Sequence, residues 1–307
     1  MDTLPYLDGP TLMRLVSWRD AVDALEGSLQ EGLRPESALP RTVNDLDHGQ
    51  LLTMPAQSSA AVGVKLSTVA PGNPAHGRPR VQAVFVLFDH QTLQPVALLD
   101  GSALTTLRTP AVSAVAVAHL VADDAARLVV IGSGPQAWGH AHAIAAVRPV
   151  RRVTVVGRDQ NRARALAERL TEEGLAAEVG PVESVRAADV VVCGTTAREP
   201  LFDGRWVPGH ACVVAIGSHE PEARELDSTV FARAERVVVE TAEVAMAEAG
   251  DVVAAVDSGA VGVDDLVGLA DAVQLRPTDG ISVFKSVGMG WQDLVVAETA
   301  YRRWHRG

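Results

Sequence analysis

Short, predominantly apolar runs alternate with segments of helical periodicity along the middle and C-terminal parts of the chain. The first run covers residues 128–131, and similar runs follow at residues 152–156, 189–193, 212–216 and 236–239. Segments such as residues 163–170, with apolar side chains three and four positions apart, lie between these runs. Continuous apolar strands that alternate with helices are typical of a parallel sheet buried on both faces. The pattern predicts a doubly wound α/β domain over residues 115–288.

The N-terminal part of the chain has a different pattern. Ser17 stands three residues before Asp20, which resembles a capping box, and Val22, Leu25 and Leu29 then fall on one helical face. These positions predict an amphipathic helix that begins after Ser17.

Two valine-rich segments, residues 61–69 and 81–88, alternate between apolar and polar positions as strands do. The turn-forming residues 71–77 separate them. Residues 291–304 have the pattern of an amphipathic helix. The chain outside the doubly wound domain is therefore predicted to be mixed α and β.

Composition and charge narrow the class of protein. The chain has 307 residues and a mass of 32.3 kDa, which suggests one large or two ordinary domains. Hydrophobic residues make up 47% and charged residues 21%, which excludes a disordered chain, a coiled coil and a collagen-like repeat. The formal net charge of −11 gives no basic surface of the kind that binds nucleic acid.

The cysteines and the apolar stretches indicate a cytoplasmic protein without a metal or a membrane segment. Cys193 and Cys212 are too few for a disulfide framework or a zinc site, and we expect reduced thiols. No basic residue precedes Arg14, so a signal peptide's charged region is missing. The longest apolar stretch, residues 111–122, is shorter than the ~20 residues that a membrane span needs.

A glycine-rich segment of the form G-x-G-x-x-A directly follows the first apolar run, and it is Gly132-Ser133-Gly134-Pro135-Gln136-Ala137. Gly132 permits a tight turn, Gly134 lets the backbone approach a pyrophosphate, and Ala137 permits close packing of helix on strand. A helix that begins there directs free N–H groups and a partial positive charge at the phosphates. The segment and its context predict a Rossmann-type dinucleotide site that includes Ser133 and Gln136.

The end of the next apolar run discriminates between NAD(H) and NADP(H). An NAD site requires an acidic residue there for the ribose 2′-hydroxyl, but the run ends in Gly157 and Arg158 follows. A guanidinium suits a 2′-phosphate, so NADP(H) is expected to be preferred, with NAD(H) as the alternative. Asp159 has two possible roles, as a helix cap or as a ligand of a ribose hydroxyl.

Three cations in the first part of the chain are candidates for binding an anion. They are Arg41, Lys65, which lies within a valine-rich run, and Arg108, which precedes Thr109-Pro110. Threonine followed by proline predicts a helix start and hence a positive helix end beside Arg108. A buried lysine needs a partner or a cavity. The spacing does not show that the three cations converge, and each alone is equally compatible with a surface or salt-bridged cation.

Four further segments are similar to motifs of the ornithine cyclodeaminase/mu-crystallin family. They lie in order along nearly the whole chain: Val64-Lys65-Leu66, residues 100–114 with Arg108-Thr109-Pro110-Ala111-Val112-Ser113, Arg224-Glu225-Leu226-Asp227, and Phe284-Lys285-Ser286-Val287-Gly288. The resemblance implies a homodimer in which residues 1–114 and 289–307 form the substrate-binding and dimerisation domain. It also implies that Arg41, Lys65 and Arg108 bind the substrate carboxylate, and that Thr195, Gly217 and Ser286 line the nicotinamide side.

One position separates the branches of that family. Cyclodeaminases carry an aspartate in a Gly-Asp-x-Pro-Gly-Lys segment, whereas this chain aligns His219 with the aspartate and Ala223 with the lysine. Gly157 points the same way, because cyclodeaminases use NAD. The resemblance thus favours the ketimine reductases, which reduce pyrroline-2-carboxylate or piperideine-2-carboxylate to proline or pipecolate by hydride transfer to C2.

The reaction needs a proton on the imine nitrogen. His219 is a candidate donor, because the unperturbed imidazole pKa of about 6.5 allows donation near neutrality, and solvent is the alternative. Asp227 is expected to be a helix cap or a structural acid. Two rival functions are ornithine cyclodeaminase and a non-catalytic protein that binds NADPH or another small ligand.

Overall fold

The computed structural model describes residues 4–306, which form two compact units. One unit contains the chain up to Thr109 together with the segment from Gly288 onward, and the other contains Pro110–Val287. Within the described part of the chain, no helix combines the length and the apolarity needed to cross a bilayer.

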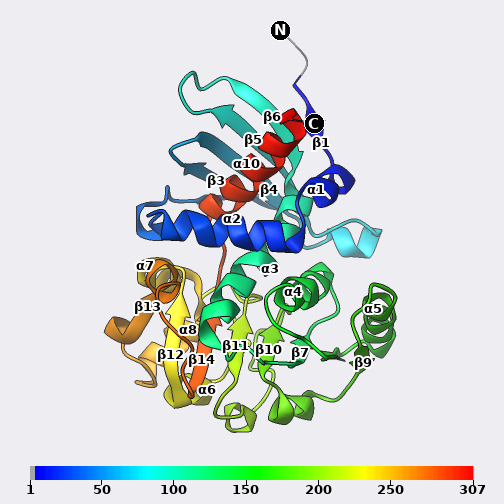
Figure 1. The fold of residues 1–307 in the computed structure, drawn as a ribbon, viewed down its shortest axis with the longest axis vertical. Helices are drawn as coiled ribbons and strands as arrows, with labels where there is room; N and C mark the ends of the chain where they lie inside the picture. Colours follow the sequence, from blue (N-terminus) through cyan, green and yellow to red (C-terminus); the bar gives the residue numbers. More distant parts are fainter. Residues whose placement is uncertain (1–3, 307) are drawn as a thin grey trace. The chain divides into compact units, whose positions relative to one another are not determined.

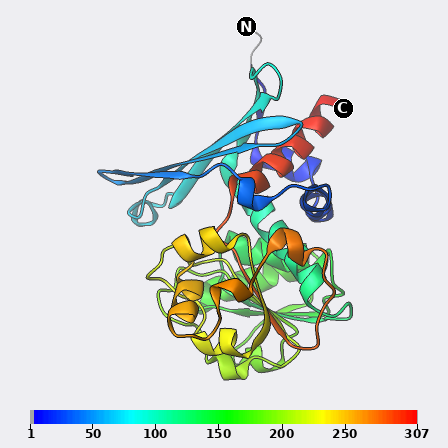
Figure 2. The same cartoon turned by 90° about the vertical axis from the view of Figure 1, so that its left-hand side faces the viewer.

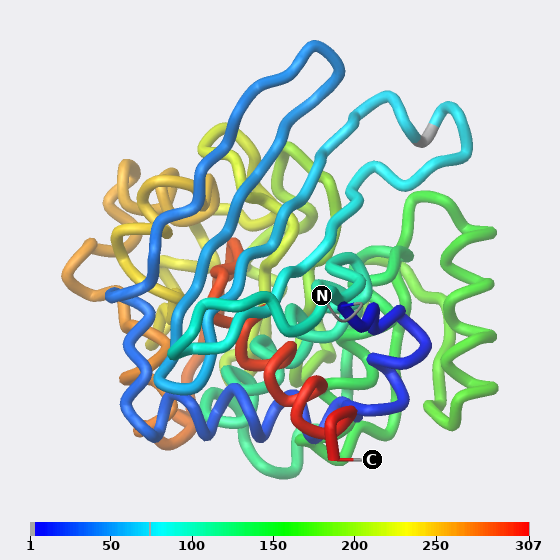
Figure 3. The backbone as a smooth tube through the Cα atoms, turned by 90° about the horizontal axis from the view of Figure 1, so that it is seen from above, coloured from blue at the N-terminus to red at the C-terminus, as the bar shows by residue number. Residues whose placement is uncertain are grey.

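The first unit is a six-stranded sheet with helices on one face. The strand order is β1-β6-β5-β4-β3-β2, with β1 parallel to β6 and the other neighbours antiparallel. The strands are β1 (Tyr6–Leu7), β2 (Thr42–Leu46), β3 (Gly49–Gln57), β4 (Ala61–Val69), β5 (Val81–Asp89) and β6 (Pro95–Asp100). The turns that join β2 to β3 and β4 to β5 lie at the same end of this sheet (Figure 3).

The helices of the first unit are α1 (Gly9–Leu15), α2 (Trp18–Gln30) and α10 (Gly290–Arg306), with short 3₁₀ turns at Pro35–Ser37 and Asn73–His76. They lie on one side of the sheet, where α10 packs against α2, β3, β4 and β5 (Figure 2). The capping box of Ser17 and Asp20 is confirmed, and Val22, Leu25 and Leu29 are buried. Asp20 also accepts two hydrogen bonds from Arg303, both of 2.6 Å, which join α10 to the start of α2.

Helix α3 (Gly101–Leu120) corrects one sequence prediction. The helix does not begin at Thr109-Pro110, because Pro110 lies inside it. The carboxylate of Asp100 accepts the N–H groups of Ser102 and Ala103, both at 3.0 Å, and so caps the helix nine residues earlier. An interior proline removes one helical hydrogen bond, but burial of the apolar residues around it holds the helix together. The two compact units divide within α3, at residues 109 and 110 rather than at the expected 114.

The second unit is the doubly wound α/β domain that the apolar runs predict. Its eight strands are all parallel, in the order β13-β12-β14-β11-β10-β7-β8-β9. They are β7 (Arg127–Ile131), β8 (Arg152–Val156), β9 (Ala177–Val179), β10 (Val190–Cys193), β11 (Cys212–Ala215), β12 (Ala234–Val239), β13 (Leu266–Gly268) and β14 (Ile281–Lys285).

Helices flank this parallel sheet (Figure 1). They are α4 (Pro135–Ala145), α5 (Gln160–Glu172), α6 (Ser228–Arg233), α7 (Ala242–Glu248), α8 (Gly250–Asp257) and α9 (Leu269–Ala272), with 3₁₀ turns at Val182–Ala187, Gly204–Trp206 and Val263–Asp265. Strand β7 has β8 on one side and β10 on the other, so the strand order reverses there. Ligands of such sheets bind at this reversal, outside the carboxyl ends of the strands.

Candidate active site

The glycine loop lies at the carboxyl end of β7, where the strand order reverses. Gly132 has a φ of +135°, and a Cβ atom there would lie 2.7 Å from the carbonyl oxygen of Gly194, so this turn requires glycine. Gly134 is the N-cap of α4, and within the described chain nothing lies within 4 Å of where its Cβ would be. This open space, in front of free N–H groups at a positive helix end, fits a pyrophosphate.

Ser133 and Gln136 flank the same loop. The Ser133 Cβ lies 3.8 Å from the position that a Cβ on Gly157 would take, at the end of β8. The buried Oε1 of Gln136 has no hydrogen-bond partner among residues 4–306. A buried acceptor without a partner is costly, so this atom is suited to a donor from a bound ligand. Both side chains therefore lie beside the glycine loop at the carboxyl ends of β7 and β8.

Asp159 acts as a helix cap, one of its two expected roles. Its carboxylate accepts the N–H groups of Asn161 and Arg162 at 3.0 and 3.1 Å and caps α5. Arg158, one residue earlier, is exposed at the carboxyl end of β8. Arg158 and Asp159 are thus adjacent exposed charges just beyond this strand end, and Asp159 is used as the cap.

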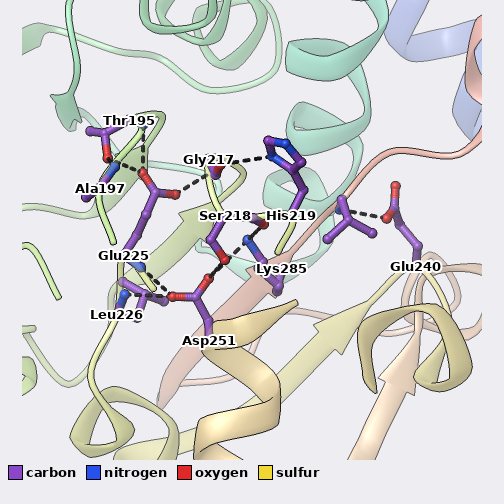
Figure 4. A network of polar contacts seen from close by, with 11 residues as sticks. Thr195, Ala197, Gly217, Ser218, His219, Glu225, Leu226, Glu240, Asp251 and Lys285 are labelled. Carbon is purple, nitrogen blue, oxygen red and sulfur yellow. Dashed lines mark hydrogen bonds and ion pairs between the residues drawn. The ribbon is translucent and has the colours of Figure 1, made fainter. Parts of the chain in front are cut away.

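A buried glutamate, Glu225, joins the loops that follow β10 and β11 (Figure 4). Its Oε1 accepts hydrogen bonds from the backbone N–H and the hydroxyl of Thr195, and its Oε2 accepts the N–H of Gly217, all at 2.7 Å. A side chain on Gly217 would collide with the Thr195 carbonyl oxygen and with Glu225 itself. Burial raises the pKa of Glu225, and the nearby Lys285 ammonium opposes that rise.

A second buried acid, Asp251 at the start of α8, holds Glu225 in turn (Figure 4). Its Oδ1 accepts the N–H groups of Glu225 and Leu226 at 2.6 and 2.8 Å. Its Oδ2 accepts the Ser218 hydroxyl at 2.7 Å and pairs with Lys285 at 3.0 Å. Lys285 also donates to the Ser218 carbonyl oxygen at 2.6 Å. The network thus fixes the loops at the ends of β10, β11 and β14.

Ser286 and His219 lie on loops of the same unit. The Ser286 hydroxyl donates to Glu240 at 2.9 Å, and the other oxygen of Glu240 accepts the N–H of Val287 at 2.9 Å. The His219 ring is exposed, and its Nδ1 lies 3.3 Å from the carbonyl oxygen of Gly217. Asp227 caps α6, as expected, and also accepts the N–H of Gly204 at 2.9 Å.

In the first unit, Lys65 and Arg108 converge on one carboxylate, that of Asp293 in the first turn of α10. Lys65 Nζ lies 2.7 Å from Oδ2, and Arg108 Nε lies 3.3 Å from Oδ1. Lys65 also donates to the Thr105 hydroxyl at 3.2 Å, and Arg108 donates through NH1 to Gln292 Oε1 at 2.7 Å. The two cations are 3% and 5% exposed and Asp293 is fully buried, so the cluster is shielded from water.

Gly288 and Arg41 complete the surroundings of the cations. Gly288 has a φ of +83°, and a Cβ there would lie 2.7 Å from Arg108 NH1, so the guanidinium packs on bare backbone. Burial lowers the pKa of Lys65 to about 8; the Asp293 carboxylate opposes this shift, while the positive charges of Arg108 and Arg41 add to it. Arg41, just before β2, is partly exposed.

Comparison with known proteins identifies the family. A model of the ornithine cyclodeaminase/mu-crystallin family matches residues 11–307. The chain belongs to this family. It is 33% identical over 304 residues to a Δ1-pyrroline-2-carboxylate reductase of Bacillus cereus, covering 94% of this chain and 93% of that one. It is 33% identical over 262 residues to the ketimine reductase mu-crystallin of Rattus norvegicus, covering 84% and 82%.

A solved structure agrees with this assignment to the ornithine cyclodeaminase/mu-crystallin family. The Thermococcus litoralis Δ1-pyrroline-2-carboxylate reductase, in complex with NADH and L-proline, superposes with a TM-score of 0.92 at 28% identity. The match covers 99% of this chain and 98% of the Thermococcus chain. The α/β fold expected from the family resemblance is therefore confirmed over 99% of the chain.

Sequence reasoning missed the buried acids of this family member. Asp293 and Gln292 lie on the buried side of an otherwise amphipathic helix, and an acid among apolar positions was a usable signal. Asp251 and Glu240 lie in segments without a distinctive pattern. Lys285 could have been found by counting, because the chain has 25 arginines but only two lysines, Lys65 and Lys285.

Proposed function

We propose that the protein is an oxidoreductase that reduces a small cyclic imine carboxylate, pyrroline-2-carboxylate or piperideine-2-carboxylate, to proline or pipecolate, with NADPH as the preferred cofactor. The observation that carries the proposal is the buried cluster in which two cations, Lys65 and Arg108, share a single carboxylate. The glycine loop, which fits a dinucleotide, and the reductases among the relatives support it.

Lys65 and Arg108 would bind the substrate carboxylate, which lies on the carbon that is reduced. Among residues 4–306, the third hydrogen on Lys65 Nζ and the NH2 group of Arg108 have no hydrogen-bond partner, so both can donate to a ligand. Charge-assisted bonds from two fixed donors hold the carboxylate and orient the C=N bond. Orientation of this kind can lower a barrier by about 7 kcal/mol or more.

The nicotinamide cofactor, when bound, supplies the hydride. The chain's part is to hold the loops after β10, β11 and β14 in place: Glu225 fixes Thr195 and Gly217, and Glu240 fixes Ser286. These loops lie at the carboxyl ends of strands, where doubly wound domains bind their ligands.

His219 is the proposed donor of the imine proton, with solvent as the alternative. The exposed ring can exchange protons with water, as a donor that acts repeatedly must. We expect His219→Ala to change the pH dependence of kcat/KM. An unchanged profile would remove His219 from the mechanism and leave the proton to solvent.

NADPH is preferred in this proposal because of Arg158, an exposed guanidinium at the end of β8 where an NAD site has an acid. Titration of NADPH and NADH with the Arg158→Ala variant tests this. We expect weaker NADPH binding and little change for NADH. Equal NADPH affinity in both proteins would mean that another group selects the cofactor.

A homodimer is also part of the proposal. On the face of the sheet opposite Lys65, partly exposed apolar side chains form cross-strand pairs between β4 and β5, Val64 with Val86 and Leu66 with Val84. The helices of this unit lie on the other face (Figure 2), so a second copy is suited to cover these residues. Light scattering should give a dimer that Val64→Asp dissociates; a monomeric wild-type protein would contradict it.

The deciding experiment follows NADPH oxidation with the two cyclic imines, alongside an assay for proline formed from ornithine and NAD. Rapid oxidation with an imine and no proline from ornithine is the expected result. Proline from ornithine without imine reduction would establish a cyclodeaminase, and NADPH binding without any turnover would establish a binding protein.

A further inference from the structure

Each of the two lysines of this chain is buried and forms an ion pair with a buried aspartate. The remaining 25 of the 27 basic side chains are arginines. Lys65 is 3% exposed and lies 2.7 Å from Asp293, while Lys285 is 1% exposed and lies 3.0 Å from Asp251. A compact ammonium group, whose protonation responds to its surroundings, is thus used only at these two places.

The Lys65 cluster has one cation more than it has anions. Lys65 and Arg108 are matched by Asp293 alone, and Gln292 and Thr105 contribute only neutral oxygen atoms. Burying an ionised group without a counter-charge is costly, and a lysine in such a place tends to lose its proton. The cluster therefore depends on Asp293 to remain doubly cationic before any ligand arrives.

The geometry of Asp293 suits this task. Its two oxygens are divided between the cations, Oδ2 to Lys65 and Oδ1 to Arg108. It lies in the first turn of α10, where the helix end stabilises a negative charge. Within residues 4–306, Lys65 Nζ donates two hydrogen bonds and Arg108 donates through Nε and NH1, so each cation keeps an N–H group that a second anion can accept.

We propose that Asp293 is a positioning residue of the carboxylate-binding site, which holds Lys65 and Arg108 at fixed places and keeps Lys65 an ammonium ion while the site waits for substrate. The inference rests on the proposed function, because it assigns to these cations the role of binding the substrate carboxylate. Asp293 itself touches neither the substrate nor the reacting atoms in this scheme.

The electrostatic balance at Lys65 defines the test. The charged groups that act on it come from three directions: Asp293 on α10, Arg108 on α3, and Arg41 before β2. Only Asp293 favours the ammonium form, and the pKa of Lys65 is already lowered to about 8. Asp293→Asn keeps the shape and removes the charge, so Lys65 should lose its proton below pH 8.

The protein's composition makes this measurement simple. In protein labelled at lysine side chains, NMR should show only two side-chain signals, which Lys65→Met assigns. We expect the Lys65 signal to titrate at lower pH in Asp293→Asn than in the wild type. Glu298→Gln, which removes an acid that pairs with Arg302 on the same helix, is the matched control and should leave the titration unchanged.

The kinetic prediction separates positioning from a merely structural role. In Asp293→Asn we expect the KM for the imine to rise about 10- to 100-fold, and the alkaline decline of kcat/KM to move to lower pH. A Lys65 titration like that of the wild type, or a loss of kcat with an unmoved pH profile, would overturn the proposal. Asp293→Glu restores the charge and should restore the titration.

The Arg108→Met variant and the lysine titration provide two further tests. If Asp293→Asn does not fold, Arg108→Met tests the same balance, since removing a positive neighbour should raise the pKa of Lys65; no change would overturn the proposal. If the wild type reduces neither imine, the proposed function fails, while the NMR titration still decides whether Asp293 keeps Lys65 charged.

Discussion

The two buried lysines differ in the balance of charge around them. Lys65 shares its aspartate with Arg108, so cations outnumber anions. Lys285 lies against Asp251 and acts electrostatically on Glu225, so anions outnumber cations. Each compact unit therefore has a buried lysine–aspartate pair, but the pair in the first unit has an excess of positive charge around it and the pair in the second unit has an excess of negative charge.

The two clusters also differ in whether the groups in excess have hydrogen-bond partners. In the second unit, the excess acids are used up by backbone donors, since Asp251 accepts the N–H of Glu225 and Glu225 accepts the N–H groups of Thr195 and Gly217. In the described part of the first unit, Lys65 and Arg108 keep N–H groups that no residue accepts. The Lys285 network therefore holds loops through its acids, whereas the Lys65 cluster keeps the donors to which the proposed function assigns the substrate carboxylate.

The largest expected effect comes from removing each lysine in turn. Lys285→Met leaves Asp251 without its counter-charge, and breaking a buried pair costs about 3–5 kcal/mol of unfolding free energy. Lys65→Met should cost less, because Asp293 keeps Arg108 as a partner, but it should abolish imine reduction. Urea-induced unfolding measures the stability of each variant, and the imine assay measures its activity. Equal stability losses in the two variants would remove the distinction drawn between the clusters.

The next effect is a pH dependence that belongs to Lys65 alone. Its pKa of about 8 in the folded protein lies below the ordinary value of 10.5, so between these values the unfolded chain binds more protons. The free energy of unfolding should therefore rise as the pH increases from about 8 to about 10.5, by on the order of 3 kcal/mol. Lys65→Met should flatten this rise, as measured by denaturation across that range. A rise of the same size in the variant would assign it to other groups.

A smaller effect is expected from neutralising the acid that joins the loops. Glu225→Gln places an amide where the carboxylate accepts three hydrogen bonds, so at least one N–H of Thr195 or Gly217 loses its acceptor. Hydrogen bonds to a charged group contribute about 1.5–3 kcal/mol, and the loosened loops should weaken NADPH binding. Calorimetric titration measures this. Binding unchanged from wild type would mean that these loops do not contact the cofactor.

The smallest effects are expected from removing one neutral hydroxyl group in each cluster, that of Ser218 beside Asp251 and that of Thr105 beside Lys65. Ser218→Ala removes a hydroxyl that donates to Asp251, which keeps Lys285 and two backbone donors, so about 1 kcal/mol of stability should be lost. Thr105→Val removes the hydroxyl near Lys65 and should mainly raise the KM for the imine. Denaturation and steady-state kinetics on both variants compare the two sites, and a reversed pattern would contradict their assignment.

Local signals in the sequence predicted much of this protein. The valine-rich run at Ala61–Val69 is a strand with those bounds, and Ser17 with Asp20 forms the capping box, because alternation and capping depend on neighbours along the chain. The glycine loop directly follows β7 for the same reason. The helix start at Thr109-Pro110 was wrong, because Asp100 caps the helix earlier and burial keeps Pro110 inside it.

What the sequence determined by itself is the alternation of strands and helices in the second unit, the family and the candidates Lys65, Arg108 and Arg158. Only the tertiary structure decided which charges meet: Asp293 is 228 residues from Lys65 along the chain, and Asp251 is 26 residues from Glu225. Periodicity and capping are short-range properties, whereas the protonation of a buried lysine depends on every charge that folding places near it. For that reason the sequence could name the cations, but only the fold could show that one aspartate holds them both.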